Sequence, residues 1–483
     1  MSRTIVGPFN RVEGDLEVQL EIQDNRVAEA WVVSPLYRGY EQILLGKDPY
    51  DALVYVPRIC GICSVAQSVA SARALADVVG LTPPPNGERA INLILAGENV
   101  ADHLTHFYLF FMPDFARAVY RDQPWFDGAE RRFKALKGTA SREVLRPRAE
   151  FMHLQGLLAG KWPHTLAIQP GGSTRAVAAE ERTHLLGLLY AFRDFLQRTL
   201  FGDSLERIIA LDSAEALEDW RRAASPETGD LRRFLHIAES LELHKLGRAS
   251  DRFMSYGAYA ASQGALFAQG VWQEGRVEAL DTARIREDVA HSWMQMQSEP
   301  RHPFDGVTLP ATDLDEGYTW CKAPRLDGQV VEVGALARQL VDGHPLIRDL
   351  VARSGGNVRN RVIARLLEIA RVTLAMEQWA RDLKPGEPFH HGGPLPDEAQ
   401  GFGLVEAARG SLGHWLKVKK GRIHNYQIIA PTTWNFSPRD RQEQPGPLEL
   451  ALRNAPVRDG ETEPVAVQHI VRSFDPCMVC TVH

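Results

Sequence analysis

Cysteine is scarce in this chain of 483 residues, which contains only five. So few thiols fit a reducing compartment and metal binding better than they fit a disulfide framework. No stretch approaches about 18 consecutive apolar residues, and the first residues, MSRTIVGPFNRVEGDLEV, contain no apolar signal core. The sequence therefore predicts neither a membrane span nor an export signal, and we expect a cytoplasmic protein.

The chain also lacks a strong excess of charge of either sign. Its formal net charge is −6 and its pI is about 6.3, with 24% charged and 44% hydrophobic residues. This balance does not suggest binding to nucleic acid or to an anionic membrane surface. A chain of this length and apolar content can bury its own core, so we expect an ordinary soluble protein.

The cysteines that are present form two Cys-x-x-Cys pairs at opposite ends of the chain. Cys60 and Cys63 lie in RICGIC, and Cys477 and Cys480 lie in DPCMVC. Four thiolates brought together would form a soft metal site, and ligand type alone leaves zinc, iron-sulfur clusters, copper(I) and nickel open. Structural zinc ribbons usually place their second pair about 15–20 residues after the first. Pairs this far apart favour a functional site over a structural zinc knot.

Apolar periodicity predicts a mainly α protein with small β elements near the termini. Residues 15–23 and 27–33 alternate around Asp24-Asn25, which predicts a β-hairpin. A helix that Ser64 could cap follows the first cysteine motif and ends at Gly80. Further helices are predicted over about 88–111, 185–200 and 362–374, and a loop over 384–403. Because both cysteine pairs must meet, we expect one domain over residues 1–483.

Four polar residues in these elements have more than one interpretation. Glu98 and Asp102 lie four positions apart on one face of the predicted helix 88–111, where they could face water or a site. His390 and His391 belong to the loop 384–403, and we expect them to be solvated instead of binding a metal.

Seven motifs, in order along nearly the whole chain, resemble those of a known family. They are RVEG (11–14), RGYE (38–41), RICGIC (58–63), YTWCKAPR (318–325), EAARGSLGHW (406–415), NYQIIAPTTWNFSPRD (425–440) and DPCMVCTVH (475–483). Together they resemble the large, catalytic subunit of [NiFe] hydrogenases, and most of all the H2-sensing, regulatory type. The resemblance implies the [NiFe] hydrogenase large-subunit fold, and it makes nickel the expected metal in place of zinc.

The resemblance further implies a Ni-Fe centre whose iron holds CO and CN ligands. Cys60 and Cys477 would bind nickel terminally, and Cys63 and Cys480 would bridge nickel to iron. Heterolytic cleavage of H2 needs a soft, electron-rich metal and a nearby base, and a terminal thiolate such as that of Cys477 can be this base. Glu13 in RVEG would relay the proton, although without the motif it would be interpreted as a surface carboxylate.

Other residues around the metal follow from the same likeness. Arg409 matches the family arginine that hangs over the open metal face, and Asp102 and Asp475 match the carboxylates that orient it. Thr432 stands where the family usually has a serine that hydrogen-bonds a cyanide, and its hydroxyl keeps that capacity. The residues implied to contact the cofactor are Gln67, Ala408, Pro431 and Thr432.

A second, hard-cation site is implied near the end of the sequence. Glu41, the carbonyl of Ile428 and the ring of His483 match a magnesium site of the family. Oxygen atoms are the ligands that Mg²⁺ prefers. Such an ion would hold the terminal segment beside the Ni-Fe centre.

Three positions depart from the usual family pattern. Gln67, four residues after Cys63, replaces the common His, so the side chain there cannot titrate. Asp15 replaces the common His after RVEG, and Ala408 replaces the common Pro before Arg409. The change at Gln67 resembles the sensor type in particular. As in the sensors, we expect a chain that ends at His483 to need no C-terminal cleavage.

The leading hypothesis is a subunit that binds and splits H2 and passes electrons to a partner. Once the site thiolates are used only Cys321 remains, so no Fe-S cluster is expected in this chain and an iron-sulfur small subunit must supply the relay. By resemblance, the complex would be a hydrogen sensor that controls hydrogenase gene expression through a histidine kinase. The alternative is an uptake hydrogenase that feeds a respiratory chain. A different class is an inert, zinc-bound or metal-free hydrogenase-like scaffold.

Overall fold

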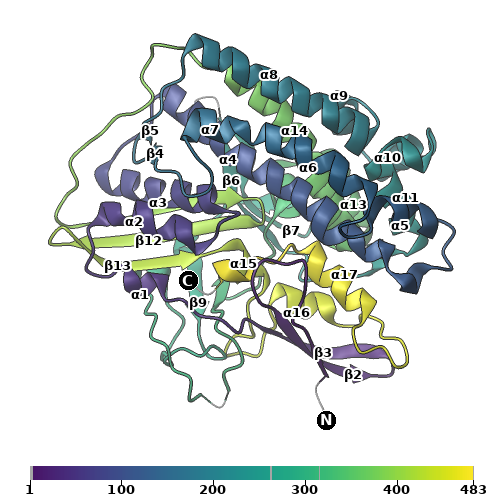
Figure 1. Ribbon diagram of the computed structural model, residues 1–483. Coiled ribbons are helices and arrows are strands. Elements are labelled where there is room, and N and C mark those ends of the chain that lie inside the picture. The colour runs from purple at the N-terminus through teal and green to yellow at the C-terminus, as the bar shows by residue number, and fades with distance from the viewer. Residues whose placement is uncertain (1–3, 262–263, 315, 482–483) are drawn as a thin grey trace.

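Long helices gather on one side of the molecule and small sheets on the other (Figure 1). The computed structural model describes residues 4–261, 264–314 and 316–481. Helices α4 (Pro85–Thr105) and α14 (Val358–Asp382) pack against each other, and α8 (Ala179–Phe195) packs on α14. Each of these matches a helix predicted from apolar periodicity.

The N-terminal sheet pairs three antiparallel strands in the order β1 (Thr4–Val6), β2 (Glu17–Gln23) and β3 (Arg26–Val33). Asp24 and Asn25 form the turn with positive φ, which these residue types tolerate well, so the predicted hairpin is confirmed. The backbone N–H of Val32 donates to the Glu449 carboxylate at 3.0 Å. Since Glu449 belongs to α16 (Pro447–Leu452), segments from the two ends of the chain lie side by side (Figure 1).

Helix α3 (Ser64–Val79) lies against the sheet formed by β11 (Ala399–Ala407), β12 (Gly410–Lys419) and β13 (Arg422–Ile429). A Cβ atom at Gly403 would stand 1.9 Å from the carbonyl oxygen of Ala70, so only glycine allows this close approach. The predicted helix is confirmed, although Cys63 and not Ser64 is its N-cap. The contact fixes α3, and the cysteine motif before it, on the sheet.

The predicted fold class is confirmed, and the structure adds sheets away from the chain ends, two of them within residues 253–326. One joins β6 (Phe253–Ala261), β7 (Gly264–Gln273) and β8 (Arg276–Glu278), and the other joins β9 (Ile285–Asp288) and β10 (Ala323–Leu326). Gly and Ala occupy many positions of β6 and β7, which weakens the alternation that would predict a strand. Helix α12 (Ala335–Asp342) covers these two strands.

Two element boundaries differ from the sequence-based expectation. The helix predicted over 88–111 changes to a π-helical turn over His106–Phe111, and the predicted loop 384–403 is shorter because β11 begins at Ala399. His390 and His391 are exposed, as expected. The remaining helices and strands are α1 (Tyr40–Ile43), α2 (Ala52–Tyr55), α5 (Phe126–Phe133), α6 (Thr139–Phe151), α7 (His153–Ala159), α9 (Leu205–Ile209), α10 (Ala214–Arg222), α11 (Asp230–Ser240), α13 (Pro345–Ser354), α15 (Pro431–Asn435), α17 (Val465–Ser473), β4 (Ile168–Gln169) and β5 (Gly172–Ser173).

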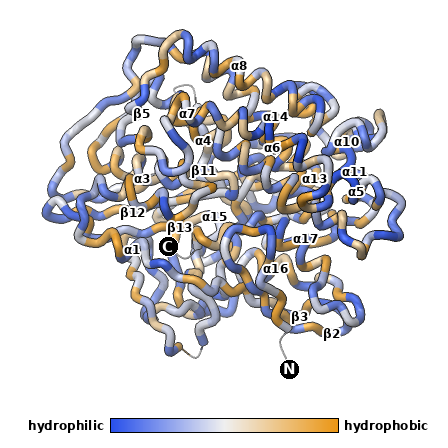
Figure 2. Tube along the Cα trace, viewed as in Figure 1, coloured by the Kyte–Doolittle hydropathy of each residue, from blue (hydrophilic) through white to orange (hydrophobic). Residues whose placement is uncertain are grey.

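Apolar residues concentrate in the interior around α3, β12 and α15 (Figure 2). The largest buried cluster draws on both ends of the chain, from Val6 to Cys480. Within residues 4–261, 264–314 and 316–481, no helix combines the length and the apolar character needed to cross a bilayer.

Candidate metal centre

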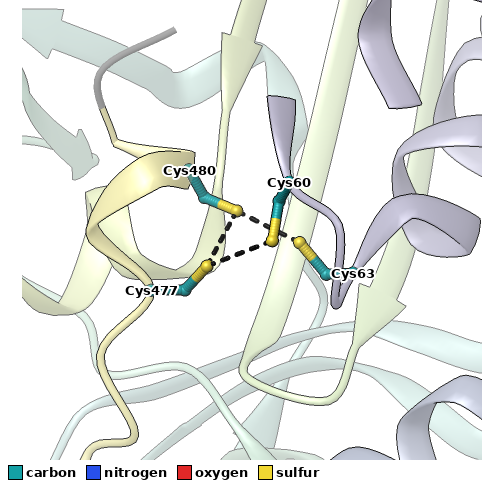
Figure 3. A group of neighbouring side chains, drawn as sticks. All are labelled: Cys60, Cys63, Cys477 and Cys480. Carbon is teal, nitrogen blue, oxygen red and sulfur yellow. Dashed lines mark hydrogen bonds between the residues drawn. The ribbon is translucent and has the colours of Figure 1, made fainter. Parts of the chain in front are cut away.

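Four cysteines from the two ends of the chain meet in the interior, and Figure 3 shows their sulfur atoms pointing toward one another. Cys60 and Cys63 precede α3, whereas Cys477 and Cys480 belong to the irregular segment after α17. All four sulfur atoms lie within 4.8 Å of one another. The nearest pairs are Cys63–Cys480 at 3.1 Å, Cys477–Cys480 at 3.2 Å and Cys60–Cys477 at 3.4 Å.

The chemistry of this donor set fits a soft metal. Burial raises the pKa of Cys477 well above its usual range, whereas hydrogen bonds from the neighbouring thiols, first that of Cys477, hold the pKa of Cys60 well below it. Four buried sulfurs at this spacing cannot all ionise without a compensating cation. A soft metal supplies the charge and prefers thiolate ligands, so these residues fit the nickel-iron group that the resemblance implies.

The backbone of the RVEG motif pairs with the second cysteine motif. The N–H of Glu13 donates to the Pro476 carbonyl at 3.3 Å, and the Glu13 carbonyl accepts from the N–H of Met478 at 2.7 Å. A Cβ atom at Gly14, whose φ is +80°, would stand 2.9 Å from the Val479 nitrogen, so glycine is required there. This pairing places Glu13 beside Cys477, with which it forms a parallel bridge.

The Glu13 carboxyl is half-buried and faces the charges of the site. Burial raises the pKa of Glu13, the nearby Cys60 raises it further, and Arg409 and Arg38 only partly offset this. Glu13 therefore holds a proton at a higher pH than an ordinary surface carboxyl does.

Arg409 is fixed by the two carboxylates expected from the sequence. Its guanidinium donates to both oxygens of Asp102, to Asp475 Oδ1 at 3.1 Å and to the Asp475 carbonyl at 2.9 Å. Burial raises the pKa of Asp102 to about 7. For Asp475 the opposing effect of burial is outweighed by Arg409 and His106, and its pKa falls. A planar guanidinium held at several points cannot rotate freely.

Thr432, Pro431 and Ala408 lie next to these groups. Thr432 Oγ1 accepts the backbone N–H of Cys477 at 3.2 Å, which leaves its own hydroxyl proton to be donated. Pro431 occupies the first position of α15, where proline is favoured. Ala408 directly precedes Arg409, and its carbonyl accepts a hydrogen bond from Arg338 at 3.0 Å.

Comparison with known proteins identifies the family. The family model described as nickel-dependent hydrogenase matches residues 38–121 and 142–483. The chain belongs to the nickel-dependent hydrogenase family. The predicted family and the predicted hydrogenase activity class are thereby confirmed.

Similar hydrogenase subunits align over essentially the whole chain. The large subunit of the periplasmic [NiFeSe] hydrogenase of Desulfomicrobium baculatum is 30% identical to this chain. The alignment covers 99% of this chain and 94% of the length of that subunit. The uptake hydrogenase large subunit of Afipia carboxidovorans and the hydrogenase-2 large chain of Escherichia coli K12 are each 28% identical over 100% of this chain, and 95% and 97% of their own. A structure of the H2-activated D. baculatum enzyme superposes with a TM-score of 0.85 at 28% identity, covering 100% of both chains.

In this hydrogenase subunit, Glu98 anchors the first cysteine pair. Its carboxylate accepts the backbone N–H groups of Val65 at 2.9 Å and Ala66 at 3.0 Å, and the indole N–H of Trp162 at 2.9 Å. Glu98 and Asp102 are both buried, so neither of them faces water. In the sequence, their place on one face of a predicted helix was the only indication that Glu98 and Asp102 could be buried together.

Glu41 and Ile428 lie together, as the resemblance implied for a hard-cation site. The N–H of Ile428 donates to Glu41 Oε1 at 2.8 Å, and Lys322 Nζ donates to Glu41 Oε2 at 2.9 Å and to Gln427 Oε1 at 2.9 Å. These oxygen atoms therefore contact the buried Lys322 ammonium. His483 lies outside the described residues.

Arg38 joins the two cysteine segments and was missed by the sequence analysis. Its guanidinium donates to the carbonyl of Ile59, before the first pair, and to that of Val479 at 2.7 Å, within the second. The signal was present, because Arg38 belongs to the RGYE motif, from which only Glu41 was given a role.

Proposed function

We propose that this subunit binds H2 and cleaves it heterolytically at a Ni-Fe(CO)(CN)2 centre held by Cys60, Cys63, Cys477 and Cys480. The observation that carries the proposal is the convergence of four buried sulfurs from both ends of the chain within 4.8 Å. When bound, the nickel-iron group takes the electrons of H2. The terminal ligands would be Cys60 and Cys477, and the bridging ligands Cys63 and Cys480.

The proton would leave through Cys477 and Glu13. A thiolate can take a proton at the reacting centre, and the backbone bridge holds Glu13 next to Cys477. Because burial raises the pKa of Glu13, its carboxyl can accept this proton and pass it on nearer to neutral pH than an exposed carboxyl could.

Arg409 and Thr432 would act on the open face of the metal and on its diatomic ligands. Asp102 and Asp475 hold the Arg409 guanidinium in one orientation, so its charge is pre-organised. Thr432 has a hydroxyl proton to donate to a cyanide. Pro431, Ala408 and Gln67 would complete the wall around the group.

A magnesium ion would bind near Glu41 and the Ile428 carbonyl, with His483 as a further ligand. Support comes from the buried oxygens of Glu41, Thr308 and Gln427 that already surround the Lys322 ammonium. Calorimetric titration with Mg²⁺ tests this: a Glu41→Gln variant should bind it more weakly than the wild type.

Electrons would leave through an iron-sulfur small subunit. The cysteine that remains, Cys321, is buried and cannot build a relay alone. Large apolar side chains stand exposed within residues 36–54, ahead of the first cysteine pair in the sequence, namely Leu36 (45%), Ile43 (43%), Leu45 (48%) and Val54 (38%). Such a group of exposed apolar residues supports docking of a partner there.

Within this activity, we propose the role of a cytoplasmic hydrogen sensor that signals to a histidine kinase. The support is sequence likeness, above all Gln67 in place of His. A second candidate is an uptake hydrogenase feeding a respiratory chain, which similarity to the uptake hydrogenase large subunit of Afipia carboxidovorans favours. Turnover separates them, because fast, sustained H2 oxidation with a dye acceptor would exclude a slow sensor.

Infrared spectroscopy of the purified complex, under argon and then H2, tests the central proposal. Bands in the carbonyl and cyanide stretching region that shift with H2 are expected. If such bands are absent and metal analysis finds zinc without nickel, the chain is an inert scaffold related to hydrogenases.

A further inference from the structure

A buried hydrogen-bond chain runs from β13 through β12 to α3. The Tyr426 hydroxyl lies 2.8 Å from His414 Nδ1, and His414 Nε2 lies 2.8 Å from the Gln67 side-chain oxygen Oε1. All three residues are at most 1% exposed. The functional roles described so far use Gln67 but neither His414 nor Tyr426.

The chemistry of the three groups fixes the direction of this chain. A carbonyl oxygen only accepts, so His414 Nε2 must carry its proton toward Gln67. In a neutral imidazole the other nitrogen, Nδ1, is then an acceptor for the Tyr426 hydroxyl. Burial raises the pKa of Tyr426, so that hydroxyl keeps the proton it donates. Each donor therefore points toward α3.

The chain ends one helical turn from a bridging cysteine. The backbone N–H of Gln67 donates to the carbonyl of Cys63, the N-cap of α3, at 3.2 Å, so Gln67 lies one helical turn beyond this cysteine. With Oε1 held by His414, the NH₂ group is the part of the Gln67 amide left to donate toward the cysteines. A thiolate favours a donor and is repelled by an amide oxygen.

The sheet is shaped so that His414 can reach α3. In the β11–β12 register Gly403 lies opposite His414, and Gly403 is the residue whose missing Cβ allows the close approach of Ala70. The same strand begins directly after Arg409.

We propose that His414 is a positioning residue, which orients the Gln67 amide so that its NH₂ donates to the Cys63 thiolate, with Tyr426 fixing the imidazole. The inference rests on the proposed nickel-iron centre. A hydrogen bond to a thiolate draws electron density from the sulfur and so from the metals it bridges. His414 would therefore set how electron-rich the centre is.

Infrared spectra of the complete complex test this through the CO band. His414→Ala should move the band to lower wavenumber, since a more electron-rich iron donates more strongly to CO, and should lower H2 oxidation about tenfold. Gln67→Ala should move it in the same direction. In the double variant His414→Ala should add nothing, because it acts through Gln67. Additive shifts, or no shift, would overturn the proposal.

Two further variants keep the test decisive. Tyr426→Phe removes a single oxygen atom and should give a smaller shift of the same sign; an unmoved band overturns the proposal even if His414→Ala fails to assemble the metal. Trp415→Phe changes the next residue of β12, which packs in a separate apolar cluster with Met254 and Ile285, and should leave the band in place. A wild-type complex without CO bands would instead refute the metal centre itself.

Discussion

The two cysteine pairs are held in place in different ways. The first pair lies at the start of a regular helix, with Cys63 as the N-cap of α3 and Glu98 bound to the backbone N–H groups of Val65 and Ala66. The second pair lies in an irregular segment whose contacts come from distant parts of the sequence. These contacts are Glu13 and Thr432 beside Cys477, and Ser34, whose hydroxyl lies 2.8 Å from that of Thr481.

This difference determines what each half of the site depends on. The position of the first pair follows from the packing of α3 on α4 and on the β11–β13 sheet. The second pair is fixed in position only when the N-terminal and C-terminal segments of the chain pack together. Metal binding to all four thiolates would therefore stabilise the long-range contacts most, and it would couple assembly of the proposed centre to folding of the whole chain.

Removal of a thiolate from the second pair should have the largest effect. Cys477→Ala leaves three sulfurs, and we expect nickel to be lost from the purified protein, because one of the two proposed terminal ligands is missing. Metal analysis by mass spectrometry checks this. The matched control is Cys321→Ala, which is also buried but lies outside the four-sulfur group, and should retain nickel. Equal nickel in both variants would contradict the assigned ligands.

Glu13→Gln should keep the metal but slow proton release. The two side chains have nearly the same shape, but an amide takes no proton near neutrality, so H2/D+ exchange should fall by about 100-fold or more. In the wild type, exchange should decline as the pH drops below the raised pKa of Glu13, and this decline should be absent in the variant. Asp15→Asn, an exposed neighbour, should keep both rate and pH profile. Wild-type exchange in Glu13→Gln would exclude the relay.

Glu98→Ala tests whether the first pair is anchored locally. The change leaves buried backbone N–H groups without their acceptor, so we expect the free energy of unfolding to fall by about 2–3 kcal/mol, measured by urea denaturation. Glu98→Gln keeps the side-chain volume and one acceptor oxygen, so its free energy of unfolding should fall less than that of Glu98→Ala. Hydrogen exchange should rise at Val65 and Ala66 but not at Met478. A rise at Met478 alone would mean that the anchor is not local.

The secondary-structure elements that depend on residues close together in the sequence were predicted correctly. The β2–β3 hairpin and helices α3, α8 and α14 follow from alternation, periodicity and turn residues within short segments. The motifs, through their resemblance, also named the residues that meet at the site, including Arg409 with Asp102 and Asp475.

The missed features depend on contacts between distant segments. The burial of Glu98, the clamp by Arg38 and the link from His414 to Gln67 join segments that are far apart in sequence, and one-dimensional periodicity contains no such information. The sheet β6–β7–β8 was missed because its small residues give little alternation, although its packing under α12 stabilises it as strands.

Acid should loosen the second cysteine segment before the first. His106, at the end of α4, lies 2.7 Å from the Arg472 carbonyl through Nε2, and burial lowers the pKa of His106 to about 3. An unfolded chain takes up this proton below about pH 6.5 but the folded protein does not, so stability falls as the pH drops below that value. His106 alone should lower the free energy of unfolding by about 1 kcal/mol between about pH 6.5 and about pH 5.5. As the pH falls, hydrogen exchange at Met478 should therefore rise before hydrogen exchange at Val65 does. In His106→Gln the two sites should respond to acid at the same pH. If Met478 still responds first in this variant, a group other than His106 causes the effect.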